Sequence, residues 1–238
     1  MPTVTNKHIL DVVGALTKEQ WYLWLRYGLN NRPYETPPIV VEYPELVVLR
    51  GVYLRELAVM AQAKTFLEIG TARGYQAMSW ADYLNSQRLM DGIVYTFDID
   101  AMDKRIYKTP MTGDQVFTRS ELWESEACAR FICFTDRTKQ SISQTIKHKI
   151  DMSYIDGQHE EAPVIEDFAE VLPFLHQDSI VVFDDCDERF SGVQKAVAAI
   201  AEKLQAPYEI VSFEPAGYKI AVMRLANCAI KANLPKRN

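Results

Sequence analysis

Six acidic residues stand at or just beyond the ends of segments whose β-branched and aromatic residues predict buried strands. These segments alternate with helical patterns from residue 65 onward, which predicts a parallel sheet with crossover helices. In an open sheet of this kind, ligands bind outside the carboxyl ends of the strands, so the acids that follow the strands are the first candidates for chemistry. They are Glu68, Asp98, Asp136, Asp156, Asp184 and Asp185.

Three of these acids could hold a divalent cation. Asp156 follows the predicted strand 151–155, and Asp184 and Asp185 follow the predicted strand 179–183, its expected neighbour. Two like charges about 4 Å apart repel by ~4 kcal/mol at an effective dielectric constant near 20. Such a cluster needs a shared proton, a basic partner or a cation, and oxygen ligands select Mg²⁺, Ca²⁺ or Mn²⁺. The alternative is that Asp184 and Asp185 cap the next turn and bind no metal.

The segment Asp156-Gly157-Gln158-His159 adds a histidine to the same edge of the sheet. Because histidine titrates near neutral pH, His159 could remove a proton from a substrate hydroxyl group. Asp156 is the other candidate for that role. The alternative is a histidine that only hydrogen-bonds its own loop.

A second site is indicated where strand 65–69 turns into helix 76–84. The turn contains Gly70 and Gly74, and glycine lets a backbone turn tightly and approach a ligand closely. The helix then points unpaired N–H groups at that ligand. The spacing E-x-G-x-x-x-G lacks the lysine of a phosphate-binding loop, and it indicates a nucleotide or nucleoside. Asp98 could accept both hydroxyl groups of a ribose, with Asp100 as the weaker alternative. An ordinary strand–turn–helix is the alternative for the whole corner.

The elements that must position these residues can be placed from the same patterns. Strands are predicted at 65–69, 93–98, 131–134, 151–155, 179–183, 208–213 and 218–223, and the last two are close enough to form a hairpin. Helices are predicted at 76–84, 164–175 and 192–204, with another around 119–129. We expect a helical N-terminal extension at 1–62, a catalytic domain at 63–226 and a tail at 227–238.

The N-terminal extension contains two predicted helices, at 19–27 and 44–63, on either side of a proline-rich loop. We expect it to cover the ligand cleft or to lie in a subunit interface, which is compatible with a homodimer. The net charge of −6 argues against a non-specific grip on nucleic acid. No apolar run approaches the ~20 residues that span a bilayer, and the polar N-terminus does not resemble a signal peptide. The sequence therefore predicts a cytoplasmic protein that binds neither nucleic acid nor a membrane.

The residues Leu67-Glu68-Ile69-Gly70-Thr71, with Gly74 and Tyr75, resemble motif I of the class I S-adenosylmethionine-dependent methyltransferases. They are most similar to the metal-assisted O-methyltransferases, such as the catechol and caffeoyl-coenzyme-A enzymes. The resemblance implies an α/β fold with a Rossmann-like seven-stranded sheet, five parallel strands plus a closing hairpin. It also implies that the glycine turn packs against the methionine part of the cofactor and that Glu68 helps to hold its amino group. The implied cofactor-binding residues are Glu68, Gly70, Thr71, Ala72, Gly74, Tyr75, Gln76, Asp98, Asp136, Arg137 and Asp156.

The same resemblance bears on the cation. In the metal-assisted enzymes, three acidic or amide residues at these strand ends hold Mg²⁺, and Asp156, Asp184 and Asp185 occupy the matching positions. Catechol-type enzymes have a lysine base where this chain has His159. The D-G-x-H segment together with Asp167 also resembles a second group of methyltransferases, which act on sugars, macrolides and other natural products.

Together these features predict an S-adenosylmethionine-dependent methyltransferase that methylates a hydroxyl group of a small molecule with the help of a divalent cation. Three alternatives stay open at this point. One is a metal-free methyltransferase with another acceptor. Another is an enzyme like the cephalosporin hydroxylases on the same fold. The third is a binding module that has lost catalysis, because a fold does not by itself determine a function.

Overall fold

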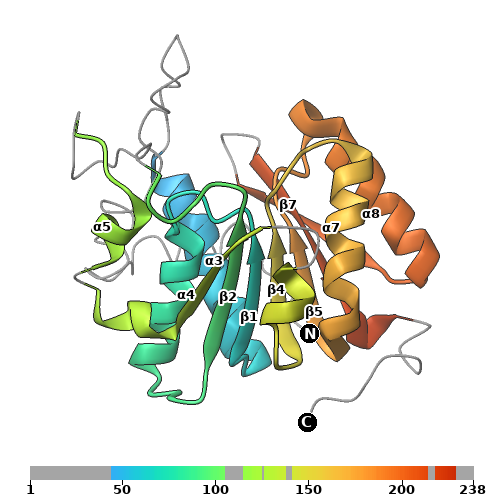
Figure 1. The fold of residues 1–238 in the computed structure, drawn as a ribbon. Helices are drawn as coiled ribbons and strands as arrows, with labels where there is room; N and C mark the ends of the chain where they lie inside the picture. Colours follow the sequence, from blue (N-terminus) through green and yellow to red (C-terminus); the bar gives the residue numbers. More distant parts are fainter. Residues whose placement is uncertain (1–43, 105–114, 125, 138–140, 214–217, 229–238) are drawn as a thin grey trace.

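The computed structural model describes residues 44–104, 115–124, 126–137, 141–213 and 218–228. The predicted helix 19–27 and the proline-rich loop therefore lie outside the described residues. The described chain forms a seven-stranded sheet with the order β3-β2-β1-β4-β5-β7-β6. Figure 1 shows this sheet between two layers of helices. The predicted fold class, an α/β methyltransferase sheet, is confirmed.

The strands lie close to the predicted positions. They are β1 (Thr65–Ile69), β2 (Ile93–Asp98), β3 (Ile132–Asp136), β4 (Ile150–Ile155), β5 (Leu175–Phe183), β6 (Tyr208–Phe213) and β7 (Tyr218–Arg224). The first five are parallel, and β7 inserts antiparallel between β5 and β6. The expected closing hairpin is thus present.

Two predicted helices differ in extent from the observed ones, and the short helix Ser141–Thr145 was not predicted. The observed helices are α3 (Pro44–Ala61), α4 (Tyr75–Ser86), α5 (Arg119–Trp123), α6 (Ser141–Thr145), α7 (Glu161–Val171) and α8 (Ser191–Leu204). The helix predicted to reach 175 ends at Val171, because Pro173 closes it in a 3₁₀ turn and β5 begins at Leu175. The predicted helix 119–129 is two short pieces, α5 and the 3₁₀ helix Ala127–Phe131.

Two hydrophobic clusters hold the helices to the sheet, one on each face. Alternate residues of each strand point to opposite faces. Phe66, Val94 and Met152 therefore pack with α3 and α4, while Leu67, Tyr95 and Ile155 pack on the other face with α6, α7 and α8. The same alternation sends Glu68 and Tyr154 toward the α3 side, where the site described below is built.

A polar cluster ties the strands together at the end of the sheet opposite the site. One carboxylate oxygen of Asp151 accepts hydrogen bonds from the backbone N–H groups of Lys64 and Thr65, at 2.7 and 3.0 Å. Its other oxygen lies 3.1 Å from Nε2 of the buried His176. Because Nδ1 of His176 accepts from the backbone N–H of Asp178, Nε2 carries the proton that Asp151 accepts. This cluster is structural and accounts for His176.

Candidate active site at the carboxyl edge of the sheet

The β1–α4 turn has the backbone conformation that its glycines predict. Gly70 and Gly74 have φ angles of 91° and 90°, and Ala72 between them has a φ of 44°. A Cβ atom on Gly70 would lie 1.8 Å from the carbonyl oxygen of Asp156, so the turn is pressed against the loop that follows β4. Only glycine fits there. The turn and the Asp156 loop are therefore held as one unit.

Asp98, the expected ribose ligand, is anchored by several groups of the protein. Its Oδ2 accepts from the backbone N–H of Ala72 at 2.8 Å and lies 2.7 Å from Nη2 of Arg119. Its Oδ1 accepts from the backbone N–H of Asp100 at 2.9 Å. The Arg119 side chain is fully buried and also donates to the carbonyl oxygens of Ala72 and Asp100. Sequence reasoning did not identify Arg119.

The remaining motif I residues form a buried network beside this anchor. The hydroxyl group of Thr96 donates to Glu68 at 2.5 Å and lies 2.7 Å from the hydroxyl group of Thr71. Burial, more than any neighbouring charge, raises the pKa of Glu68 to about 8. Gln76 is buried, and neither its amide oxygen nor its amide nitrogen has a hydrogen-bond partner among the residues that the structure describes. Such an amide is available to a ligand at the turn.

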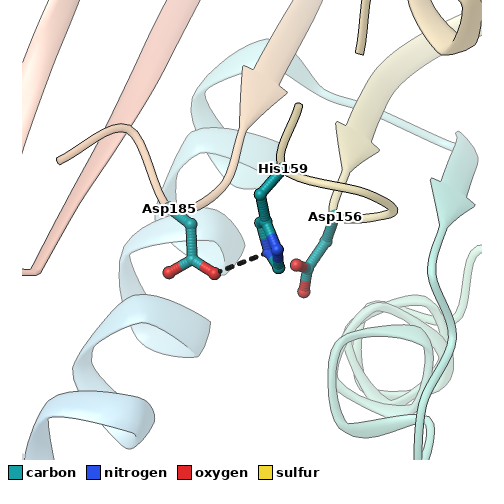
Figure 2. Close-up of side chains that lie close together, drawn as sticks. All are labelled: Asp156, His159 and Asp185. Carbon is teal, nitrogen blue, oxygen red and sulfur yellow. Dashed lines mark ion pairs between the residues drawn. The ribbon is translucent and has the colours of Figure 1, made fainter. Parts of the chain in front are cut away.

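Three of the predicted catalytic and metal-binding residues come together beyond β4 and β5. Asp156, His159 and Asp185 each offer a ligand atom, and these atoms lie within 4.8 Å of one another. Figure 2 shows the imidazole ring of His159 between the two carboxyl groups. Its Nε2 lies 3.0 Å from Oδ2 of Asp185, and its ring stacks on Phe190 at 4.3 Å. The ring is therefore oriented on two sides.

Asp184, the third predicted metal ligand, has a different partner. Its Oδ2 accepts a 2.6 Å hydrogen bond from Nη1 of Arg50, a residue of α3. The same Nη1 lies 3.0 Å from the hydroxyl group of Tyr218. Oδ1 of Asp184 and the hydroxyl group of Tyr154 are buried without a hydrogen bond of good geometry among the described residues. Sequence reasoning gave Asp184 no basic partner and did not identify Arg50.

The charges at this edge interact strongly. Burial, and then the neighbouring charge of Asp184, hold the pKa of Asp156 well above its usual range. Burial and Asp184 likewise raise the pKa of Asp185 to about 6, while His159 and Arg50 lower it. An additional positive charge at this site would therefore favour the ionised form of Asp156.

Asp136 and Arg137, which the resemblance placed among the cofactor-binding residues, lie at the end of β3 and just after it. Asp136 is exposed. Arg137 forms ion pairs with Asp167 and Glu170 of α7. A Cβ atom on Gly157 would lie 2.7 Å from a carboxylate oxygen of Asp167, so Asp167 packs against the loop that carries His159. Arg137 and Asp167 thus brace this loop.

An open groove of about 860 Å³ lies between α5 and β3. Trp123 borders it, and the same indole covers Gly74 and donates to the carbonyl oxygen of Arg73 at 3.1 Å. None of the residues predicted for the cofactor or the cation lines this groove. The other lining residues are Met102, Ser120, Glu121, Glu124, Glu126, Ala129, Ile132 and Phe134.

A family model described as a methyltransferase domain matches residues 67–186. This stretch runs from the acid-ending strand β1 through the glycine turn, Asp98 and the Asp156–His159 loop to Asp184 and Asp185. The chain belongs to the methyltransferase domain family. The resemblance to class I S-adenosylmethionine-dependent methyltransferases is confirmed at the level of the family.

Solved structures agree with the fold of this methyltransferase. It is similar to the O-methyltransferase TomG of Streptomyces achromogenes, with a TM-score of 0.59 and 18% identity over 90% of this chain and 95% of that one. An O-methyltransferase from Bacillus cereus has a TM-score of 0.57 and 16% identity, with 94% and 92% covered. The O-methyltransferase NovP has a TM-score of 0.61 and 13% identity, with 92% and 99% covered.

One curated relative also matches this methyltransferase. The uncharacterized protein R132 of Acanthamoeba polyphaga mimivirus is 36% identical over 74 residues, which are 29% of this chain and 34% of that protein. This methyltransferase thus spans about a third of the length of that relative. Among the described residues, no helix combines the length and the apolar character needed to cross a bilayer.

Proposed function

We propose that this methyltransferase transfers the methyl group of S-adenosylmethionine to a hydroxyl oxygen of a small molecule, with a divalent cation at the Asp156 edge. One observation supports this more than any other. The glycine turn, whose Gly70 rests against Asp156, lies beside both Asp98 and the group formed by Asp156, His159 and Asp185. Nucleoside, cation and base positions thus meet at one edge of the sheet. TomG was solved with S-adenosylmethionine and the Bacillus cereus enzyme with S-adenosylhomocysteine, which fits this choice of cofactor.

The residues present fit the proposed cofactor. Gly70 and Gly74 give the turn its positive φ angles, and the α4 N–H groups follow directly. The unpartnered Gln76 amide supplies both a donor and an acceptor. Asp98 is fixed by Ala72, Asp100 and Arg119, and a carboxylate has about four lone-pair sites, so it can still accept from a ribose hydroxyl group. When bound, S-adenosylmethionine supplies an electrophilic methyl group.

The residues also fit a divalent cation. The carboxylates of Asp156 and Asp185 offer hard oxygen ligands, which suit Mg²⁺ or Mn²⁺, and the imidazole of His159 lies within ligand distance of both. The two carboxyl groups of Asp156 and Asp185 lie close together, and a bound cation would offset their mutual repulsion. When bound, the cation would lower the pKa of a substrate hydroxyl group.

When the two carboxylates hold the cation and His159 does not ligate it, His159 is the residue best placed to receive the proton of that hydroxyl group. With Nε2 donating to Asp185, Nδ1 of His159 can accept this proton. The stacked ring of Phe190 and the Asp185 carboxylate hold the imidazole in one orientation. A positioned general base typically contributes about 10²–10⁴-fold to the rate.

A metal-free methyltransferase is the second candidate, and one observation favours it. The pair His159 and Asp185 can act as a base and its orienting acid without a cation. Arg50 already supplies one positive charge to the cluster through Asp184. In this case His159 alone deprotonates the acceptor.

Calorimetry with S-adenosylhomocysteine tests the cofactor. We expect binding by the wild type and at least about tenfold weaker binding by Asp98→Asn, because an amide is a weaker acceptor for a diol. Asp103→Asn, a change on the chain just beyond Asp98, is the matched control. Absence of binding by the wild type would contradict the proposal.

Methyl transfer from labelled cofactor to a panel of phenols, sugars and glycosides tests the reaction. Activity that falls on chelation and returns with Mg²⁺ or Mn²⁺ supports the cation-assisted mechanism. Activity that survives chelation but is lost in His159→Gln supports the metal-free one.

A further inference from the structure

Arg50 is a positively charged residue that interacts with most of the acidic groups at the carboxyl edge of the sheet. Its guanidinium donates to Asp184 at 2.6 Å and to Tyr218 at 3.0 Å. Its side chain is only 13% exposed and lies 5.6 Å from the centre of the Tyr154 ring. The group is therefore buried within the cluster and fixed on three sides.

The charge of Arg50 reaches beyond its direct partner. Its partner Asp184 directly precedes Asp185, and the backbone N–H of Asp184 donates to the carbonyl oxygen of Ile155, the residue before Asp156, at 3.0 Å. Arg50 is therefore held beside the loops after the neighbouring strands β4 and β5, which carry the proposed cation ligands. A cation bound by Asp156, His159 and Asp185 would lie among the same charges.

Two consequences follow for such a cation. A fixed positive charge beside the site repels a divalent ion, and the repulsion is large where water is excluded. Arg50 also occupies Oδ2 of Asp184, which sequence reasoning counted among the metal ligands. Both effects weaken binding of a divalent cation.

We propose that Arg50 is a built-in counter-ion of the active site, which holds Asp184 and lowers the affinity of the Asp156–His159–Asp185 group for a divalent cation. Arg50 is thus a positioning residue that sets how much metal the enzyme needs. The inference rests on the proposed function, since it concerns the cation of that site.

Mn²⁺ binding measures this directly, because the paramagnetic signal of free Mn²⁺ reports occupancy without any acceptor substrate. We expect Arg50→Met, which removes the charge and keeps an apolar stem, to bind Mn²⁺ at least about tenfold more tightly than the wild type. Arg50→Lys keeps the charge and is expected to stay within about threefold of the wild type.

Arg55→Met is the matched control on the same helix. Arg55 pairs with Asp82 rather than with the acidic cluster, so its loss is expected to leave the Mn²⁺ affinity unchanged. Thermal unfolding monitors each variant. If Arg50→Met does not fold, Arg50→Gln removes the charge while keeping a donor for Asp184, and the same tightening is expected.

The outcomes distinguish failure of this inference from failure of the proposed function. Mn²⁺ affinity of a neutral Arg50 variant that equals or falls below that of Arg55→Met would overturn the inference and leave the proposed function intact. Equal tightening in Arg50→Lys would also overturn it, because the effect would then be steric. If none of the proteins binds Mn²⁺ while S-adenosylhomocysteine still binds, both the cation and the counter-ion role are rejected, and the metal-free methyltransferase is retained.

Discussion

Replacing Arg119 with methionine probes the link between the glycine turn and the proposed ribose ligand. The Arg119 side chain is fully buried, pairs with Asp98 at 2.7 Å and donates to the carbonyl oxygens of Ala72 and Asp100. Breaking a buried ion pair by removing one partner typically costs about 3–5 kcal/mol. For a domain of this size, this corresponds to a fall of roughly 6–20 °C in the melting temperature.

The structure also predicts which residue accounts for most of this loss of stability. Most of the cost arises because Asp98 keeps its charge without a partner, so Asp98→Asn should remove much of it. In a double-mutant cycle, Arg119→Met and Asp98→Asn are expected to be non-additive by about 2 kcal/mol or more in the free energy of unfolding. Chemical denaturation of the four proteins measures this coupling.

Cofactor binding supplies a second measurement for the same variants. Arg119→Met is expected to weaken S-adenosylhomocysteine binding at least about tenfold, since Asp98 and the turn lose a shared anchor. Arg130→Met is the matched control, because Arg130 is exposed and bonds to Asn85 in the last turn of α4. A loss below about 1 kcal/mol in the free energy of unfolding of Arg119→Met, or additive effects in the double-mutant cycle, would refute the reasoning.

Three further predictions follow from the same geometry. Burial raises the folded-state pKa of Asp185 to about 6, so the protonated carboxyl group stabilises the folded state at low pH, and this contribution is lost as the pH rises from about 4 to about 6. With chelator present, the free energy of unfolding of the wild type should fall by up to about 3 kcal/mol relative to that of Asp185→Asn across this window. Denaturation at pH 4 and pH 7 measures the difference. Gly70→Ala should abolish S-adenosylhomocysteine binding in calorimetry, because its Cβ would lie 1.8 Å from the carbonyl oxygen of Asp156; retained binding would show that the turn can move. Asp151→Ala should lower the free energy of unfolding by about 2–4 kcal/mol, because the backbone N–H groups of Lys64 and Thr65 and the His176 side chain lose their acceptor. The affinity of the folded protein for the cofactor should stay unchanged.

The sheet and its acidic edge could be predicted because both depend on local patterns. Strand-forming runs end in acids at Glu68, Asp98 and Asp156, and parallel strands must share one carboxyl edge. The glycine turn was likewise predictable, since positive φ angles at Gly70 and Gly74 favour glycine whatever surrounds them. Helix ends were less accurate where a proline or a change of direction intervened.

The partners of these acids were not predictable, because a charge finds its partner through space. Arg50 and Asp184 are 134 residues apart in the chain, and no local pattern marks either as the other's partner. Arg119 reaches Asp98 from an intervening segment in the same way. Even the grouping of Asp156 and Asp185 with His159 depends on how two loops pack.

The sequence by itself indicated the family through the resemblance of motif I, and it predicted the succession of strands along the chain and the edge that carries the acidic residues, because these depend on patterns within a few consecutive residues. Only the tertiary structure decided which carboxylates pair with arginine and which lie around His159. The physical reason is that burial and charge pairing depend on distances between side chains that folding alone brings together.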